Sequence, residues 1–122
     1  MTLDTGALIA IERGSRRMQA LLDEAGVAHA VLAVPAGVVG QAWRGQPRQA
    51  LLARFLGQHN VEVVPLDDLT ARAGGVLCGR AGTDDIVDAS VVLCARQRGH
   101  HVVTSDHSDL RLLDPELRLL RP

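Results

Sequence analysis

Asp88 is the residue whose neighbours in the sequence point most directly to chemistry. It interrupts residues 86–95, a run that is apolar nearly all round and therefore predicts a buried helix. Its neighbours three and four residues ahead are Val91 and Val92, so the carboxylate lies on an apolar stripe. An ionised aspartate is almost never fully buried without a partner, and the chain contains no lysine. We therefore expect a positive partner for Asp88, and a metal ion is the leading candidate.

Two further aspartates stand at the ends of predicted strands. Asp4 ends the first predicted strand and Asp106 follows the fourth, and ligands of open parallel sheets bind at that edge. If these two strands are neighbours, the carboxylates of Asp4, Asp88 and Asp106 meet. Clustered carboxylates repel each other, and an oxygen-only set without paired His or Cys favours Mg²⁺ or Mn²⁺. The matching chemistry is metal-assisted cleavage of a phosphodiester.

The elements that must position these residues alternate between strands and helices. Short apolar runs predict strands at residues 1–4, 30–34, 61–64, 101–104 and 117–120. Apolar spacing and capping residues predict helices at residues 6–11, 16–25, 38–44, 47–58 and 67–77, one between an N-cap at Thr83 and a stop at Gly99, and a helical turn at 109–113. This alternation predicts an α/β fold with a mainly parallel sheet and right-handed crossovers.

Three blocks of the sequence resemble those of PIN-domain ribonucleases, and more closely those of the VapC-type toxins of bacterial toxin–antitoxin pairs. The blocks are residues 3–10 (LDTGALIA), Asp88-Ala89, and residues 102–110 (VVTSDHSDL). They occur in the right order, and the length of the chain also matches. The resemblance implies a single PIN-like domain over residues 1–122. It implies a three-layer α/β sandwich, with a mainly parallel sheet of four to five strands and helices on both faces.

The resemblance also implies an activity, a cofactor and partners. Asp4, Asp88 and Asp106 would hold Mg²⁺ or Mn²⁺, with Asp109 as an additional acid nearby. Thr5 and Thr104 would position carboxylates or water. The implied reaction is endonucleolytic cleavage of RNA (tRNA, rRNA or mRNA). The implied partners are a cognate antitoxin, which inserts a C-terminal segment into the site, and a second copy of the chain in a homodimer.

One position departs from the family pattern. A fourth acid, Glu, normally stands on the helix after the second strand, where this chain has Gln41. Gln41 can accept a hydrogen bond or ligate through its carbonyl oxygen, but it removes one negative charge. We therefore expect weaker metal binding, with Asp84 and Asp85 as substitute sources of charge. A PIN-fold module that binds RNA or antitoxin without cutting is the alternative function.

Each candidate residue also has a purely structural explanation. Asp88 could be capped by backbone or paired with a distant arginine, Asp4 and Asp109 could cap helices, and Asp106 could be a turn residue. Asp84 and Asp85 favour the first turn of a helix, where acids stabilise the dipole. Residues outside the acidic set also have open roles: His107 as a ligand, Trp43 in packing, in a dimer contact or in RNA stacking, and Arg13, Arg16, Arg17, Arg44 and Arg48 as a phosphate-facing rim or a solvated surface.

The composition excludes several other classes of protein. The 122 residues suit one domain, and the net charge of −1 gives no global attraction to nucleic acid or membrane. The chain lacks a signal peptide, a membrane-spanning apolar run, a P-loop, and the lysine that a receiver domain requires. Position 6 is Gly, where a haloacid-dehalogenase-type phosphatase would have a second aspartate. Cys78 and Cys94 form no CxxC pattern, so we expect a reduced, cytoplasmic protein in which both pack as small apolar side chains.

Overall fold

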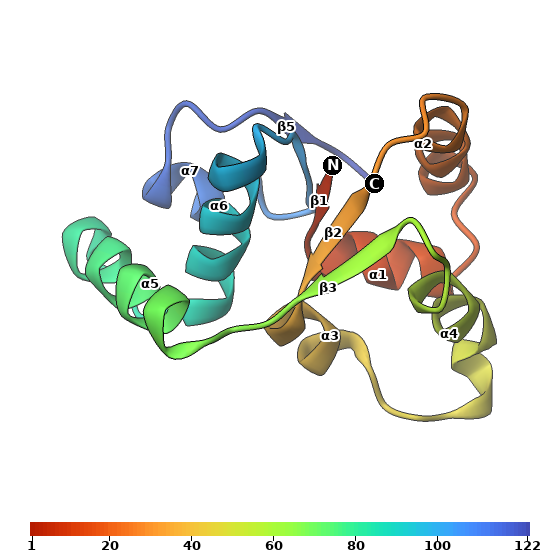
Figure 1. Ribbon diagram of the computed structural model, residues 1–122, viewed down its shortest axis with the longest axis horizontal. Helices are drawn as coiled ribbons and strands as arrows, with labels where there is room; N and C mark the ends of the chain where they lie inside the picture. Colours follow the sequence, from red (N-terminus) through yellow and green to blue (C-terminus); the bar gives the residue numbers. More distant parts are fainter.

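A five-stranded parallel sheet forms the centre of the computed structural model, which describes residues 1–122 (Figure 1). The strands are β1 (Thr2–Leu3), β2 (Leu32–Pro35), β3 (Val61–Val64), β4 (Val102–Val103) and β5 (Leu119–Leu120). Their spatial order is β3-β2-β1-β4-β5, and every neighbouring pair is parallel. The central strand is β1, with Thr2 opposite Ala33 on one side and Val102 on the other. The first and fourth strands are therefore neighbours, as the convergence of Asp4 and Asp106 requires.

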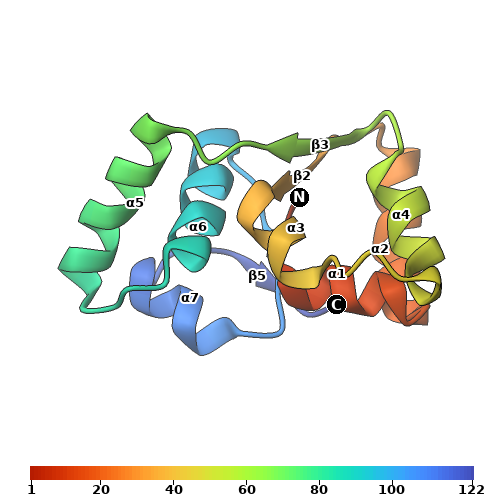
Figure 2. The same ribbon diagram turned by 90° about the horizontal axis from the view of Figure 1, so that it is seen from below.

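Helices cover both faces of the sheet. They are α1 (Thr5–Glu12), α2 (Arg16–Val27), α3 (Ala36–Ala42), the 3₁₀-helix η1 (Pro47–Gln49), α4 (Ala50–Leu56), α5 (Asp68–Ala81), α6 (Ile86–Arg98) and α7 (His107–Leu113). Helices α5, α6 and α7 lie together on one side, and α1, α2 and α4 lie on the other (Figures 1 and 2). Helix α6 contacts β1, β2 and β4, whereas α1 contacts β1 and α4 contacts β3. The predicted PIN-like α/β fold is confirmed.

The core between these layers consists almost entirely of aliphatic side chains, because the chain has few aromatic residues. Val91 and Val92 of α6 are fully buried, which confirms α6 as a buried helix. Cys78 and Cys94 are also buried and free, as the sequence predicted. None of the helices is long and apolar enough to cross a membrane.

The start of α6 differs from the prediction. Asp85, not Thr83, is the N-cap, and its carboxylate accepts a hydrogen bond of 3.0 Å from the backbone N–H of Asp88. The Thr83 hydroxyl instead accepts from the N–H of Asp85 at 3.3 Å, which forms a small turn before the helix. Asp88 therefore lies in the first turn of α6 rather than in the second. Gly99 ends the helix in the left-handed conformation, as predicted.

Three other boundaries differ from the prediction for local reasons. Asp106 caps the last helix, so α7 begins at His107, and the N-cap role considered for Asp109 is wrong. The predicted helix over 47–58 is divided into η1 and α4. Helix α5 continues unbroken through Gly74, which packs against α6: a Cβ there would lie 2.7 Å from the Cδ1 atom of Ile86. Gly74 therefore permits close helix packing and does not break the helix.

Candidate active site

Asp4 lies directly after β1, at the carboxyl edge of the sheet, and is only 5% exposed. It is the N-cap of α1, and its Oδ1 accepts a hydrogen bond of 2.7 Å from the backbone N–H of Thr5. Its Oδ2 accepts a second bond, of 2.8 Å, from the hydroxyl of Thr104. Asp4 therefore does cap a helix, and each carboxylate oxygen retains a lone pair that could bind a cation.

Thr104 links the two acids at the ends of β1 and β4. Its side chain is fully buried, and its hydroxyl accepts a hydrogen bond of 2.9 Å from the backbone N–H of Asp106 while it donates to Asp4. Asp106 in turn caps α7 and accepts from the N–H of Asp109 at 3.5 Å. A single hydroxyl thus fixes the separation of Asp4 and Asp106.

Asp88 enters the site from α6 and is half-buried. Burial raises the pKa of this carboxyl most, and the charges of Asp85, Asp4, Asp106 and Asp109 raise it further, to about 7. No hydrogen bond to the side chain of Asp88 offsets this penalty, because only its backbone N–H has a partner. The structure therefore gives Asp88 no positive partner, and neither the backbone cap nor the arginine pair considered for its carboxylate forms.

The acids surround an open cleft of about 190 Å³ without any apolar or basic lining residue. Its lining residues are Asp4, Thr5, Gly6, Gln41, Asp85, Asp88, Ser105 and Asp106. Carboxylate oxygens of Asp88, Asp106 and Asp109 all lie within 4.8 Å of one another. Asp109 thus joins the acids from the rim, whereas Asp4 forms the buried end of the cleft and lies outside this group of three.

Like charges dominate the electrostatics of the cleft. Burial, followed at lower weight by the charges of Asp106 and Asp85, raises the pKa of Asp4, although the hydrogen bonds from Thr104 and Thr5 lower it. The hydrogen bond with Asp106 and then the charge of that residue raise the pKa of Asp109. No cationic side chain lines the cleft to relieve this repulsion.

The acidic group fits a hard divalent cation. Two oxygens bound to one Mg²⁺ at about 2.1 Å lie at most about 4.2 Å apart, so shifts of less than about 1 Å would bring all three carboxylates onto one ion. The outer two, Asp106 and Asp109, are exposed and free to make such shifts. The set contains only oxygen donors, which Mg²⁺ and Mn²⁺ prefer.

Gln41 reaches the cleft from the last turn of α3. Its Oε1 accepts a hydrogen bond of 2.5 Å from the hydroxyl of Thr5, the residue after Asp4. Thr5 therefore contacts Gln41 through its side chain and Asp4 through its backbone. The carbonyl oxygen that could have ligated a cation is already engaged as an acceptor.

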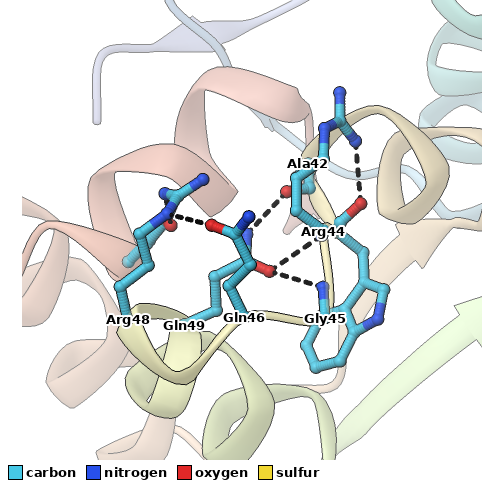
Figure 3. Close-up of polar contacts among 8 residues, drawn as sticks. Ala42, Arg44, Gly45, Gln46, Arg48 and Gln49 are labelled. Atoms are coloured by element: carbon cyan, nitrogen blue, oxygen red, sulfur yellow. Dashed lines mark hydrogen bonds and ion pairs between the residues drawn. The ribbon is translucent and has the colours of Figure 1, made fainter.

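A buried amide holds the end of α3 in place (Figure 3). Gln49, 1% exposed, donates from Nε2 to the carbonyl of Ala42 at 2.8 Å. Its Oε1 accepts from the N–H groups of Arg44 and Gly45 at 2.8 and 3.1 Å. Gln49 thus satisfies a carbonyl that the helix end leaves free and fixes the loop that follows Gln41.

Three residues of the cleft were not among the predicted site residues. Asp85 was weighed mainly as an acid of the first helical turn, yet it caps α6 and also lines the cleft. Gly6 and Ser105 meet across the cleft, and a Cβ on Gly6 would lie 2.3 Å from the Oγ of Ser105. The glycine in the first block was the one signal for this close approach. The other substitute acid considered, Asp84, does not line the cleft.

The remaining candidates lie outside the cleft. The Nε2 atom of His107 is buried without a hydrogen-bond partner, and this residue does not line the cleft. Trp43 is 41% exposed at the end of α3. Of the five arginines considered as a rim, Arg48 pairs with Glu12, and Arg44 donates to the carbonyls of Gly40 and Trp43.

Comparison with known proteins identifies the family. The PIN domain family model matches residues 1–114. Among solved structures, FitAB bound to an IR36 DNA fragment is similar, with 17% identity and a TM-score of 0.67 over 100% of this chain and 95% of that chain. FitAcB from Neisseria gonorrhoeae has 18% identity and a TM-score of 0.65 over 98% of this chain and 95% of that one. A search of curated proteins finds no match. Because the family model spans nearly the whole sequence, the chain belongs to the PIN-domain family.

Proposed function

We propose that the chain is a metal-dependent endoribonuclease, the toxin of a type II toxin–antitoxin pair. The convergence of Asp4, Asp88 and Asp106 at the ends of β1 and β4 and the start of α6 carries this proposal. Membership of the PIN-domain family supports a nuclease, and the likeness of the three sequence blocks to VapC-type toxins supports RNA as substrate.

In this proposal Asp4, Asp88 and Asp106 hold Mg²⁺ or Mn²⁺, with Asp109 as a further acid at the rim. The ion, when bound, supplies a Lewis acid for the phosphodiester and activates water. Thr104 orients the buried Asp4 and the start of the segment that carries Asp106. Thr5 and Gln41 close the other side of the cleft and occupy each other's polar atoms.

The test is cleavage of a structured RNA by the purified protein with Mg²⁺ or Mn²⁺. We expect cleavage that EDTA abolishes and that Asp88→Asn reduces at least 100-fold. Glu24→Gln, which removes an exposed acid of α2, is the matched control and should cleave normally. Robust cleavage by the Asp88→Asn protein would refute the role of Asp88.

A binding module without cleavage activity is the second candidate, and Gln41 favours it. The amide has one negative charge less than the glutamate usual in the family, and its Oε1 accepts from Thr5. Gln41→Glu restores that charge with nearly the same shape. A gain of cleavage in this variant alone indicates a dormant site, whereas multiple turnover by the natural protein excludes the binding-module function.

We further propose an antitoxin and a second copy of the chain as partners, in the cytoplasm. The resemblance to VapC-type toxins supports both, and FitAB, a structure of similar fold, is bound to DNA. A small reading frame for a DNA-binding protein immediately upstream would support the antitoxin. Co-expression of the two proteins followed by purification through a tag on one of them tests the complex.

A further inference from the structure

A second groove adjoins the acidic cleft along α1. It has a volume of about 480 Å³ and shares two lining residues, Gly6 and Ser105, with the cleft, so the two spaces are continuous. Gly6, Ile9, Ala10 and Arg13 stand at helical spacing on one face of α1 and form its floor. The floor therefore runs from the acids at one end of α1 to an arginine at the other.

Unpaired positive charge gathers at the far end of this groove. Arg13 follows α1, and Arg16 and Arg17 form the first turn of α2, where no acidic residue accompanies them. All three are exposed, and none belongs to the four ion pairs of the chain. Basic residues in a first turn oppose the helix dipole, so helix stability does not explain their placement. We call Arg13, Arg16 and Arg17 the arginine rim.

The character of the surface changes from the cleft to the rim in the way that a nucleic acid strand requires. The cleft is acidic and suits a phosphate only through a cation, whereas Ile9 and Ala10 offer an apolar floor for bases and the rim offers guanidinium groups to phosphates. From Gly6 to Arg13 the helix rises about 10 Å, which is the length of about three stacked nucleotides.

We propose that this groove binds the segment of single-stranded RNA next to the cleaved phosphate, with bases on Ile9 and Ala10 and phosphates at the arginine rim. The inference rests on the proposed nuclease function, because the position of the scissile phosphate comes from that proposal. It adds a determinant of substrate length, since an RNA of two nucleotides is too short to reach from the acids to the rim.

Binding is tested separately from cleavage, with fluorescein-labelled RNAs of two and eight nucleotides in EDTA. Arg13→Gln combined with Arg16→Gln should lower the slope of log affinity against log salt by about 1.4, at about 0.7 for each phosphate contact. If the proteins bind equally at 1 M salt, that slope corresponds to about 25-fold weaker binding of the longer RNA at 0.1 M. Arg80→Gln, which removes an exposed and unpaired arginine on α5, is the control and should change nothing.

A second variant tests the floor without touching the rim. Ala10→Glu introduces a carboxylate into the groove and keeps a strong helix former, so the fold is retained while the longer RNA binds less tightly. In cleavage assays both variants should raise KM for the eight-nucleotide RNA, leave kcat unchanged, and leave the two-nucleotide RNA unaffected.

The outcomes separate this inference from the proposed function. Equal RNA binding by the natural protein and both variants overturns the groove, even if the protein cleaves RNA. Binding that depends on the rim supports the groove even if no cleavage is found, which would contradict only the nuclease. If the rim variants lose an acidic antitoxin peptide but retain RNA, the groove is a protein-binding surface and the inference is wrong.

Discussion

Replacement of Asp88 by Asn should stabilise the metal-free protein while it abolishes metal binding. The carboxylate of Asp88 accepts no hydrogen bond and is surrounded by acids, so the nearly isosteric amide removes a repelled charge without loss of a partner. The folded protein has its pKa near 7, whereas the ordinary value is 3.8. The folded state therefore holds a proton between about pH 4 and pH 7 that the unfolded chain has released.

The sign and the size of the effect follow from that difference. Because the folded state binds more protons, the free energy of unfolding of the natural protein falls as the pH rises from about 4 to 7. The full difference in pKa corresponds to about 4 kcal/mol, and solvent screening of this half-exposed group reduces it to about 1–2 kcal/mol. In a chain of this size, that is an increase in Tm of roughly 3–8 °C.

Thermal and urea unfolding in EDTA at pH 5 and pH 8 measure the effect. Asp88→Asn should unfold at a higher temperature than the natural protein at pH 8, and the advantage should shrink at pH 5. Addition of Mg²⁺ or Mn²⁺ should stabilise the natural protein and not the variant. Glu24→Gln should lie within about 0.5 kcal/mol of the natural protein throughout. An Asp88→Asn protein that is no more stable at pH 8 would refute the claim that this charge is penalised.

Three further substitutions test other parts of the structure. Gly6→Ala should destabilise the fold by about 1–3 kcal/mol, since its Cβ would collide with Ser105, whereas Gly26→Ala, in open space on α2, should stabilise it by up to about 1 kcal/mol; equal unfolding midpoints would contradict the close approach. Gln49→Leu should lower the free energy of unfolding by about 2–4 kcal/mol, because it strands the N–H groups of Arg44 and Gly45 and the carbonyl of Ala42, and a neutral result in urea unfolding would show that water replaces the amide. If the homodimer forms through the exposed apolar face of α5, Leu69→Glu with Val76→Glu should halve the mass measured by light scattering, whereas Val27→Glu on α2 should not; a natural protein that is monomeric at every concentration would end that prediction.

The sequence predicted the parts of the site that depend on strand ends. Asp4 and Asp106 follow apolar runs, and the carboxyl ends of parallel strands share an edge, so their convergence required only that β1 and β4 be neighbours. Thr104 could be assigned a positioning role from its place in the third block, although its bonds to both acids depend on the register of the two strands.

What the sequence did not predict depends on competition between similar residues or on contacts across the fold. Thr83 and Asp85 are both good N-caps, and only the entry angle of α6 selects Asp85 and brings its carboxylate to the cleft. The contact between Gly6 and Ser105 joins segments about a hundred residues apart, so no local pattern encodes it. The same holds for the bond between Thr5 and Gln41, because it requires the packing of α1 against α3.

The position of β1 at the centre of the sheet has a consequence for the biosynthesis of the chain. Its partner β4 is made about a hundred residues later, and the bond between Thr104 and Asp4 spans 100 positions. Asp4 emerges from the ribosome among the first residues, but Asp106 can join it only when nearly the whole chain has been released. A nascent chain therefore has no assembled cleft, and a nuclease built in this way is silent toward the messenger and the ribosome that are producing it.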